Sequence, residues 1–256
     1  MIYNFHTHTS RCGHASGNDE EYIKCAIEAG IKHLGFSDHA PFIFPDGFES
    51  NWRVPLSLAE DYVKEIDSLR KKYSDKIDIT IGFEMEYYED YFDKMLNIAR
   101  KCGAEYLILA QHFILGEHPN GIGSVGPTDN EYHLQRYIDE VIKGMRTGLF
   151  SYVAHPDLVC FTGNAQAYKR EITRLCQASI ELDIPLEINM LGIRNKKHYP
   201  ADAFWKIVGE TAAPVTIGFD AHNPSDFLDA NQHIAADRLI REFGLNYIGM
   251  PKLRKI

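Results

Sequence analysis

The chain is poor in cysteine and has no long apolar run. Its five cysteines, an odd number, are scattered and form no CxxC pair: Cys12, Cys25, Cys102, Cys160 and Cys176. Reduced thiols explain this pattern better than a disulfide framework does. No apolar run is long enough to span a membrane, and no signal-peptide pattern stands ahead of the first apolar residues. We therefore expect a soluble cytoplasmic protein that does not bind membranes.

The chain also lacks positive charge. Its formal net charge is −9, whereas a nucleic-acid-binding surface needs a basic patch. This balance predicts a small-molecule partner and no nucleic acid, and it says nothing about oligomeric state. With 256 residues, of which 45% are hydrophobic and 25% charged, the chain has the composition of a globular protein. We expect one large domain over residues 1–256.

Short β-rich runs alternate along the chain with segments of helical periodicity, as in α/β folds with a parallel sheet. Strands are expected near residues 1–8, 33–39, 77–84, 106–112, 152–155, 185–189 and 214–220, with a possible short eighth at 245–248. Helices are expected near 17–30, 58–73, 92–102, 130–147, 169–182, 201–210 and 231–243. The glycine-rich segment 116–126 lacks the ending of a P-loop, so we interpret it as an active-site loop or a plain connector.

The first strand contains His6-Thr-His8, and side chains two residues apart in a strand point the same way. Ligand-type residues also end the later β-runs. They are His39, Glu84, His112, His155 and Asp220. His222 follows Asp220 by two residues, which is the spacing of His6 and His8.

In a parallel barrel the C-terminal strand ends form one face, so these side chains are expected to meet there. The set is too large for one tetrahedral zinc. It predicts two or three divalent ions with bridging carboxylates, and imidazole with carboxylate suits Zn²⁺, Fe, Mn²⁺ or Ni²⁺.

The chain resembles the PHP (polymerase and histidinol phosphatase) superfamily, and within it the stand-alone histidinol-phosphate phosphatases. The matching motifs occur in the family's order from residue 6 to residue 222. They are HTHT at 6–9, CGHA at 12–15, GFSDHAP at 35–41, GFEMEY at 82–87, QHF at 111–113, HPDL at 155–158, EIN at 187–189 with GIR at 192–194, and FDAH at 219–222.

This resemblance implies a distorted TIM-like (β/α)7 barrel with a trinuclear metal site at the C-terminal ends of the strands. His6, His8, Glu84 and Asp220 would hold one ion, Glu84 would bridge to a second held by His112 and His155, and His14, His39 and His222 would hold the third. Cys12, which lies between His8 and His14, is expected to tune or supplement this site. Asp38 is expected to support the site from behind His39.

The implied reaction is hydrolysis of L-histidinol phosphate in histidine biosynthesis. Phosphate monoesters need rate accelerations approaching ~10²¹, and one acid or base supplies only about 10²–10⁴. A metal cluster that generates a bridging hydroxide supplies the remainder, and we expect that hydroxide to attack in line. Ser10 and Ser37 have no evident activating base, so no covalent intermediate is predicted.

Substrate contacts are predicted from charge. Arg194 and Arg53 are the expected phosphate ligands, and Arg11 is a weaker third. Glu86 and Glu117 are expected to meet the substrate ammonium, and His198 to protonate the leaving group or touch the imidazole. The alternative for each arginine is an ordinary surface arginine, and for His198 it is a surface histidine.

Two alternatives stay open at this stage. The first is a hydrolase of related architecture, such as a PHP phosphodiesterase or nuclease, a general monoesterase or an amidohydrolase-like barrel. The acidic balance disfavours a nuclease, and no strand-end lysine is present for an amidohydrolase. The second is a non-catalytic metal-binding module, which is expected to have lost ligands, whereas every ligand position is filled here.

Overall fold

The computed structural model describes residues 1–256 and contains an eight-stranded, all-parallel sheet. Its strands lie in the order β1-β2-β3-β4-β7-β8-β9-β10, so they follow the chain. They are β1 (Tyr3–Asn4), β2 (His33–His39), β3 (Asp78–Met85), β4 (Tyr106–Leu109), β7 (Phe150–Val153), β8 (Leu186–Asn189), β9 (Pro214–Gly218) and β10 (Asn246–Tyr247). The predicted α/β barrel class and the short eighth strand are both confirmed.

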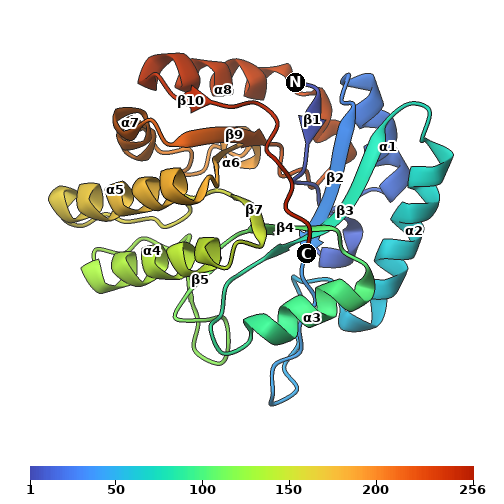
Figure 1. Ribbon diagram of the computed structural model, residues 1–256, viewed down its shortest axis with the longest axis horizontal. Helices are drawn as coiled ribbons and strands as arrows, with labels where there is room; N and C mark the ends of the chain where they lie inside the picture. The colour runs from blue at the N-terminus through green and yellow to red at the C-terminus, as the bar shows by residue number, and fades with distance from the viewer.

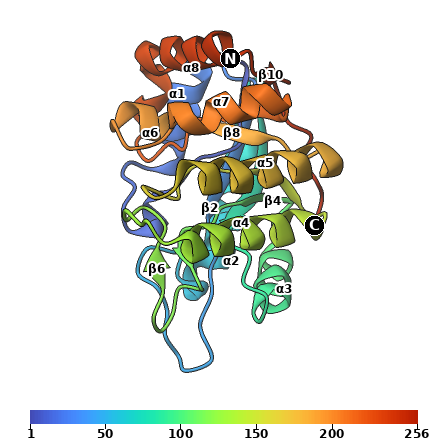
Figure 2. The ribbon, with the colours of Figure 1, turned by 90° about the vertical axis from the view of Figure 1, so that its left-hand side faces the viewer.

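The long helices lie around the outside of the sheet (Figure 1), and four of them are stacked as successive layers on one side (Figure 2). They are α1 (Asp19–Glu28), α2 (Ala59–Lys72), α3 (Phe92–Cys102), α4 (Glu131–Arg146), α5 (Ala165–Leu182), α7 (Asp202–Thr211) and α8 (Ala230–Phe243). The fold also contains elements that were not expected from the sequence, namely the short helix α6 (Met190–Arg194) and the 3-10 turns η1 (Ser10–Cys12), η2 (Leu56–Leu58) and η3 (Pro224–Leu228). No helix combines the length and the apolarity that a membrane crossing requires.

The sheet curls until its two ends meet at one level of the barrel. Thr7 forms a parallel bridge with Ala221, through a His8 N–H to Ala221 C=O bond of 2.9 Å and an Ala221 N–H to His6 C=O bond of 3.2 Å. β10 pairs in parallel with the first residues of β9, at the opposite end of that strand from Asp220. The closure therefore lies immediately beside His6 and His8, and it fixes them against the segment that carries Asp220.

Strand β4 shows how alternation builds the two apolar layers. Leu107 and Leu109 belong to the large core between sheet and helices, whereas Tyr106 and Ile108 belong to a smaller cluster inside the barrel. The Tyr106 hydroxyl donates to the carbonyls of Phe5 and Phe36 inside this cluster. The barrel interior below the strand ends is thus filled by side chains.

The glycine-rich segment forms a small hairpin from β5 (Phe113–Ile114) and β6 (Ile122–Gly123). It lies beside the long loop 41–55 that follows β2 (Figure 2). The ring of His118 in the hairpin stacks on Phe48 in that loop at 4.0 Å and is bonded to Asp46. These two segments form one wall at the open end of the barrel.

Candidate metal centre

All the predicted metal ligands converge at the C-terminal end of the barrel. Most of them are carried by strands or by the residues that directly follow strands, and His14 follows η1. Sets that can share an ion, with donor atoms within 4.8 Å of one another, include His6–His8–Glu84, His39–Glu84–His112, His6–His155–Asp220 and His14–His39–His222. The nine predicted residues thus lie together, and the set His14–His39–His222 is one that the resemblance implied, whereas His112 groups here with His39 and His155 groups with His6 and Asp220.

Glu84, on β3, lies at the centre of this cluster with both oxygens facing imidazoles. Its Oε1 is 2.9 Å from His155 Nε2, 3.4 Å from His6 Nε2 and 3.5 Å from His112 Nε2. Its Oε2 is 3.3 Å from His8 Nε2 and 3.0 Å from His39 Nδ1. One carboxylate that reaches rings on both sides is the geometry that a bridging ligand requires.

Asp220 supplies the second carboxylate. Its Oδ1 lies 3.5 Å from His6 Nε2 and 3.2 Å from both His8 Nε2 and His222 Nδ1. Asn189, at the end of β8, donates to the other oxygen of Asp220 at 3.0 Å and fixes the orientation of the carboxylate.

Hydrogen bonds behind the rings set which imidazole nitrogen faces the cluster. Carboxylates accept from Nδ1 of three ligands: Glu187 from His6 at 2.9 Å, Asp38 from His8 at 3.4 Å and Glu86 from His112 at 2.7 Å. The Nδ1 of His14 donates to the Cys12 carbonyl at 2.9 Å. Each bond leaves Nε2 with a free lone pair for a metal.

The donor atoms fit divalent ions. The buried atoms His6 Nε2, His8 Nε2, His39 Nδ1, Glu84 Oε2 and Asp220 Oδ1 have no hydrogen-bond partner. Unpaired buried polar atoms are costly, and ion coordination removes that cost. Two ligands bound at about 2.1 Å to one tetrahedral ion are roughly 3.4 Å apart, which is close to the spacings around Glu84.

The pKa shifts in the cluster also favour the binding of cations. Burial opposes protonation of His6, but Asp220, Glu187 and Glu84 outweigh it and raise the pKa of His6 to about 10. Burial would raise the pKa of Glu84, yet the surrounding histidines hold that pKa well below its usual range. The cluster thus attracts positive charge.

Two of the predicted ligands have a strained backbone. His155 and Asp220 have φ values of 28° and 48°, in the region that residues with side chains rarely adopt. Such strain persists only where surrounding contacts enforce it, and it gathers at functional sites. Here it turns two side chains that follow β7 and β9 into the cluster.

A cavity of about 590 Å³ opens over the cluster. Its remaining walls come from loops and from the short helix α6. They are lined by Trp52, Val125, Leu158, Leu191, Asn195, Lys197, His198 and Tyr199. Cys12 is buried with its sulfur near His8 and His222, as a supplementary donor would be.

The structure corrects the role expected for Arg53, which does not line this cavity. Arg53 is only 1% exposed, and its guanidinium donates to Glu86 at 2.6 Å, to Glu117 at 2.6 and 3.0 Å and to the Ala40 carbonyl at 3.1 Å. Glu86 in turn accepts from His112. Arg53, Glu86 and Glu117, which were all expected to contact the substrate, thus form a buried chain that orients the predicted ligand His112, and none of them lines the cavity.

Burial would raise the pKa of Glu86, but Arg53 and His112 outweigh burial and lower it. Glu86 is therefore an anion held between a guanidinium and an imidazole. In this arrangement it supports His112 and is unavailable to a substrate ammonium.

Arg194 is likewise committed inside the protein. It donates to the carbonyls of Phe219 and Asp220 at 2.7 and 2.9 Å, to Gln232 at 2.7 Å and to Asp226 at 3.2 Å. These bonds tie α6 to the segment that carries Asp220, so Arg194 positions that ligand. It does not line the cavity.

Of the other residues considered from the sequence, His198 lines the cavity, whereas Arg11 and Ser37 do not. Arg11 pairs with Asp19 and Glu65, away from the cluster. Ser37 is buried and accepts from the Thr7 N–H. His198 does line the cavity, where its Nε2 donates to the Leu158 carbonyl at 2.9 Å.

Sequence reasoning missed Trp52, Lys197 and Glu187 as site residues. Trp52 and Lys197 belong to loops, where no periodicity shows which way a side chain points. Glu187 had a usable signal, because it precedes Asn189 by two residues on β8 and so shares its face.

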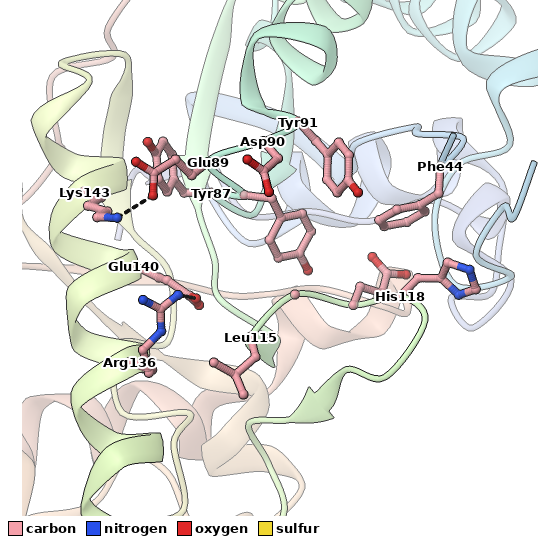
Figure 3. Close-up of a pocket in the computed structure, with 13 residues that line it drawn as sticks. Phe44, Tyr87, Glu89, Asp90, Tyr91, Leu115, His118, Arg136, Glu140 and Lys143 are labelled. Atoms are coloured by element: carbon pink, nitrogen blue, oxygen red, sulfur yellow. Dashed lines mark hydrogen bonds and ion pairs between the residues drawn. The ribbon is translucent and has the colours of Figure 1, made fainter. Parts of the chain in front are cut away.

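A second cavity, of about 360 Å³, is lined by residues that include Tyr91, Leu115 and Arg136 (Figure 3), and also by Glu117. Two ion pairs lie among its lining side chains, Lys143 with Glu89 at 2.5 Å and Arg136 with Glu140 at 2.9 Å. It contains none of the predicted metal ligands. The chemistry therefore belongs to the cavity over the histidines.

Comparison with known proteins places this geometry in a family. The model of the PHP domain matches residues 4–190. A probable histidinol-phosphatase of Deinococcus radiodurans is 27% identical over 241 residues, which cover 90% of this chain and 91% of that protein. The histidinol-phosphatase of Bacillus subtilis is 26% identical over 255 residues, covering 86% and 93%.

Among solved structures, the chain is similar to the crystal structure of histidinol phosphate phosphatase from Lactococcus lactis complexed with zinc, L-histidinol and phosphate. The TM-score is 0.72 with 19% identity, covering 96% of this chain and 95% of that one. At this identity the likeness shows a common fold.

Proposed function

We propose that this chain, which belongs to the PHP domain family, is a metal-dependent phosphomonoesterase that hydrolyses L-histidinol phosphate to L-histidinol and phosphate. The observation that carries the proposal is the convergence of histidines on both oxygens of Glu84 beneath an open cavity. The relatives named histidinol-phosphatase, and the similar structure that holds zinc, L-histidinol and phosphate, support the choice of substrate.

Divalent ions bound to these ligands would polarise the phosphoryl oxygens and lower the pKa of water, which supplies a nucleophile at neutral pH. The protein's own part is positional. Glu187, Asp38 and Glu86 orient His6, His8 and His112, and the closure between Thr7 and Ala221 holds two ligand segments together. Leu158, Leu191 and Val125 limit water around the rest of the substrate.

The test is phosphate release by metal-reconstituted protein from L-histidinol phosphate, an aryl monoester and a phosphodiester, compared side by side. We expect kcat/KM for L-histidinol phosphate to exceed the others by about 10-fold or more, because a fitted cavity rejects leaving groups that leave its polar groups unpaired. His112→Ala should lower release about 100-fold. Equal turnover of all monoesters, or preference for the diester, would overturn the proposed substrate.

Lys197 is the cavity residue whose charge suits the phosphate. It lines the cavity and has no ion pair, whereas Arg53 and Arg194 are committed to internal acceptors. Hydrogen bonds to charged groups contribute about 1.5–3 kcal/mol, so Lys197→Gln should raise KM roughly 10-fold with a smaller change in kcat.

The matched control for this prediction is Lys196→Gln. Lys196 precedes Lys197, is exposed and lies outside the cavity. Steady-state kinetics of both variants should show the rise in KM for Lys197→Gln alone. An unchanged KM in both would assign phosphate binding to the metal ions by themselves.

A further inference from the structure

We infer that Trp52 is a specificity-determining residue that binds the heteroaromatic, cationic end of the substrate, while the phosphate lies at the metal cluster. The inference rests on the proposed function and extends it to the leaving group. It also gives a role to the long loop 41–55, which follows the C-terminal end of β2 and carries Trp52 to the site.

Trp52 stands directly beside the metal ligands. Its ring centroid is 4.5 Å from that of His39 and 4.9 Å from that of His112, with interplanar angles of 69° and 74°. It lines the cavity and is partly exposed there, whereas Tyr199, the other large aromatic wall residue, is only 6% exposed. A group attached to a phosphate at the cluster therefore lies within reach of the indole.

The indole is held in place before any ligand arrives. Its Nε1–H donates to Glu117 at 3.1 Å, and the Arg53 guanidinium lies 4.8 Å from the ring centroid. Arg53 and Glu117 are themselves joined by hydrogen bonds of 2.6 and 3.0 Å. Because these partners already fix the ring, little conformational freedom is lost when a ligand packs against it.

The chemistry of the indole matches the proposed leaving group. L-histidinol has an imidazole ring and an ammonium group, and both are attracted to an aromatic face through stacking and cation–π contacts. Val125, Leu158 and Leu191 offer only aliphatic surface. Within this cavity Trp52 is thus the wall that distinguishes an aromatic, cationic leaving group from an aliphatic alcohol.

The experiment compares kcat/KM for L-histidinol phosphate and for glycerol phosphate, which has neither a ring nor an amine. Contacts of this type contribute about 0.5–2 kcal/mol, so Trp52→Leu should lower kcat/KM for L-histidinol phosphate roughly 3- to 30-fold and leave glycerol phosphate little changed. Trp52→Phe should keep most of the preference. Phe48→Leu, which alters an exposed aromatic residue of the same loop outside the cavity, is the matched control.

Fluorescence gives a second measurement that is independent of turnover. The chain has two tryptophans, and Trp205 is fully buried with its Nε1–H donating to Asp157. Titration of metal-loaded protein with L-histidinol should change the emission of the wild type and not that of Trp52→Phe, which still contains Trp205.

The outcomes separate the inference from the proposed function. If Trp52→Leu lowers kcat/KM equally for both substrates, Trp52 only shields the metal site, and the inference fails while the function stands. If the wild type does not prefer L-histidinol phosphate, the proposed function fails and takes the inference with it. An identical fluorescence change in wild type and Trp52→Phe also overturns the inference.

Discussion

Glu84→Gln is expected to lower phosphatase activity by about 10³-fold or more and to reduce the number of metal ions bound per chain. The change keeps the size of the side chain but removes the charge that faces rings on both sides of the cluster. It also replaces one acceptor oxygen with an amide nitrogen, which cannot ligate an ion as a carboxylate does. The rings concerned are those of His6, His8, His39, His112 and His155.

Phosphate release and elemental analysis of the purified variant measure both effects. The control is Glu89→Gln, because Glu89 lies just beyond the end of β3, is exposed and pairs only with Lys143. Metal addition should stabilise the wild type more than Glu84→Gln, since a ligand stabilises the folded state in proportion to its binding free energy. A variant with full metal content and activity within about 10-fold of the wild type would exclude a bridging role for Glu84.

The ligand cluster was predictable because its residues obey strand periodicity. His6 and His8 share a face by a spacing of two, and Glu84 and His39 occupy paired positions on neighbouring strands. In a parallel sheet this brings the strand-end residues together, since the carboxyl ends of all strands point the same way. His14, which follows η1, was expected only from the family resemblance. The same alternation led us to expect Asp38 to support the site from behind His39. In the structure its carboxylate accepts from the His39 N–H at 2.9 Å and from His8 Nδ1 at 3.4 Å.

The substrate residues were not predictable in this way. Arg53 was assigned to phosphate because a free guanidinium binds it well, but the partner Glu117 is 64 residues away in another loop. Only the folded chain shows that Arg53 is buried between two carboxylates. Loop side chains have no period that reveals their direction, so charge alone suggested a contact that burial excludes.

Arg53→Met is expected to lower the free energy of unfolding by about 3–5 kcal/mol, because it leaves Glu86 and Glu117 without the charge that faces them. Urea unfolding measures the effect. Arg70→Met is the matched control, since Arg70 also pairs with two carboxylates, Asp67 and Glu105, but is about one-third exposed. Exposed pairs contribute about 0–1 kcal/mol, so the control should unfold almost as the wild type does.

A second substitution separates loss of charge from loss of packing. If unpaired carboxylates cause the destabilisation, adding Glu117→Gln to Arg53→Met should recover part of the lost stability, because one buried anion is removed. If the double variant is no more stable than Arg53→Met, the loss comes from packing around the side chain. Equal destabilisation by Arg53→Met and Arg70→Met would mean that the buried chain from Glu117 to His112 has no special energetic role. In the expected case, the stability of this wall and the orientation of a metal ligand depend on the same guanidinium.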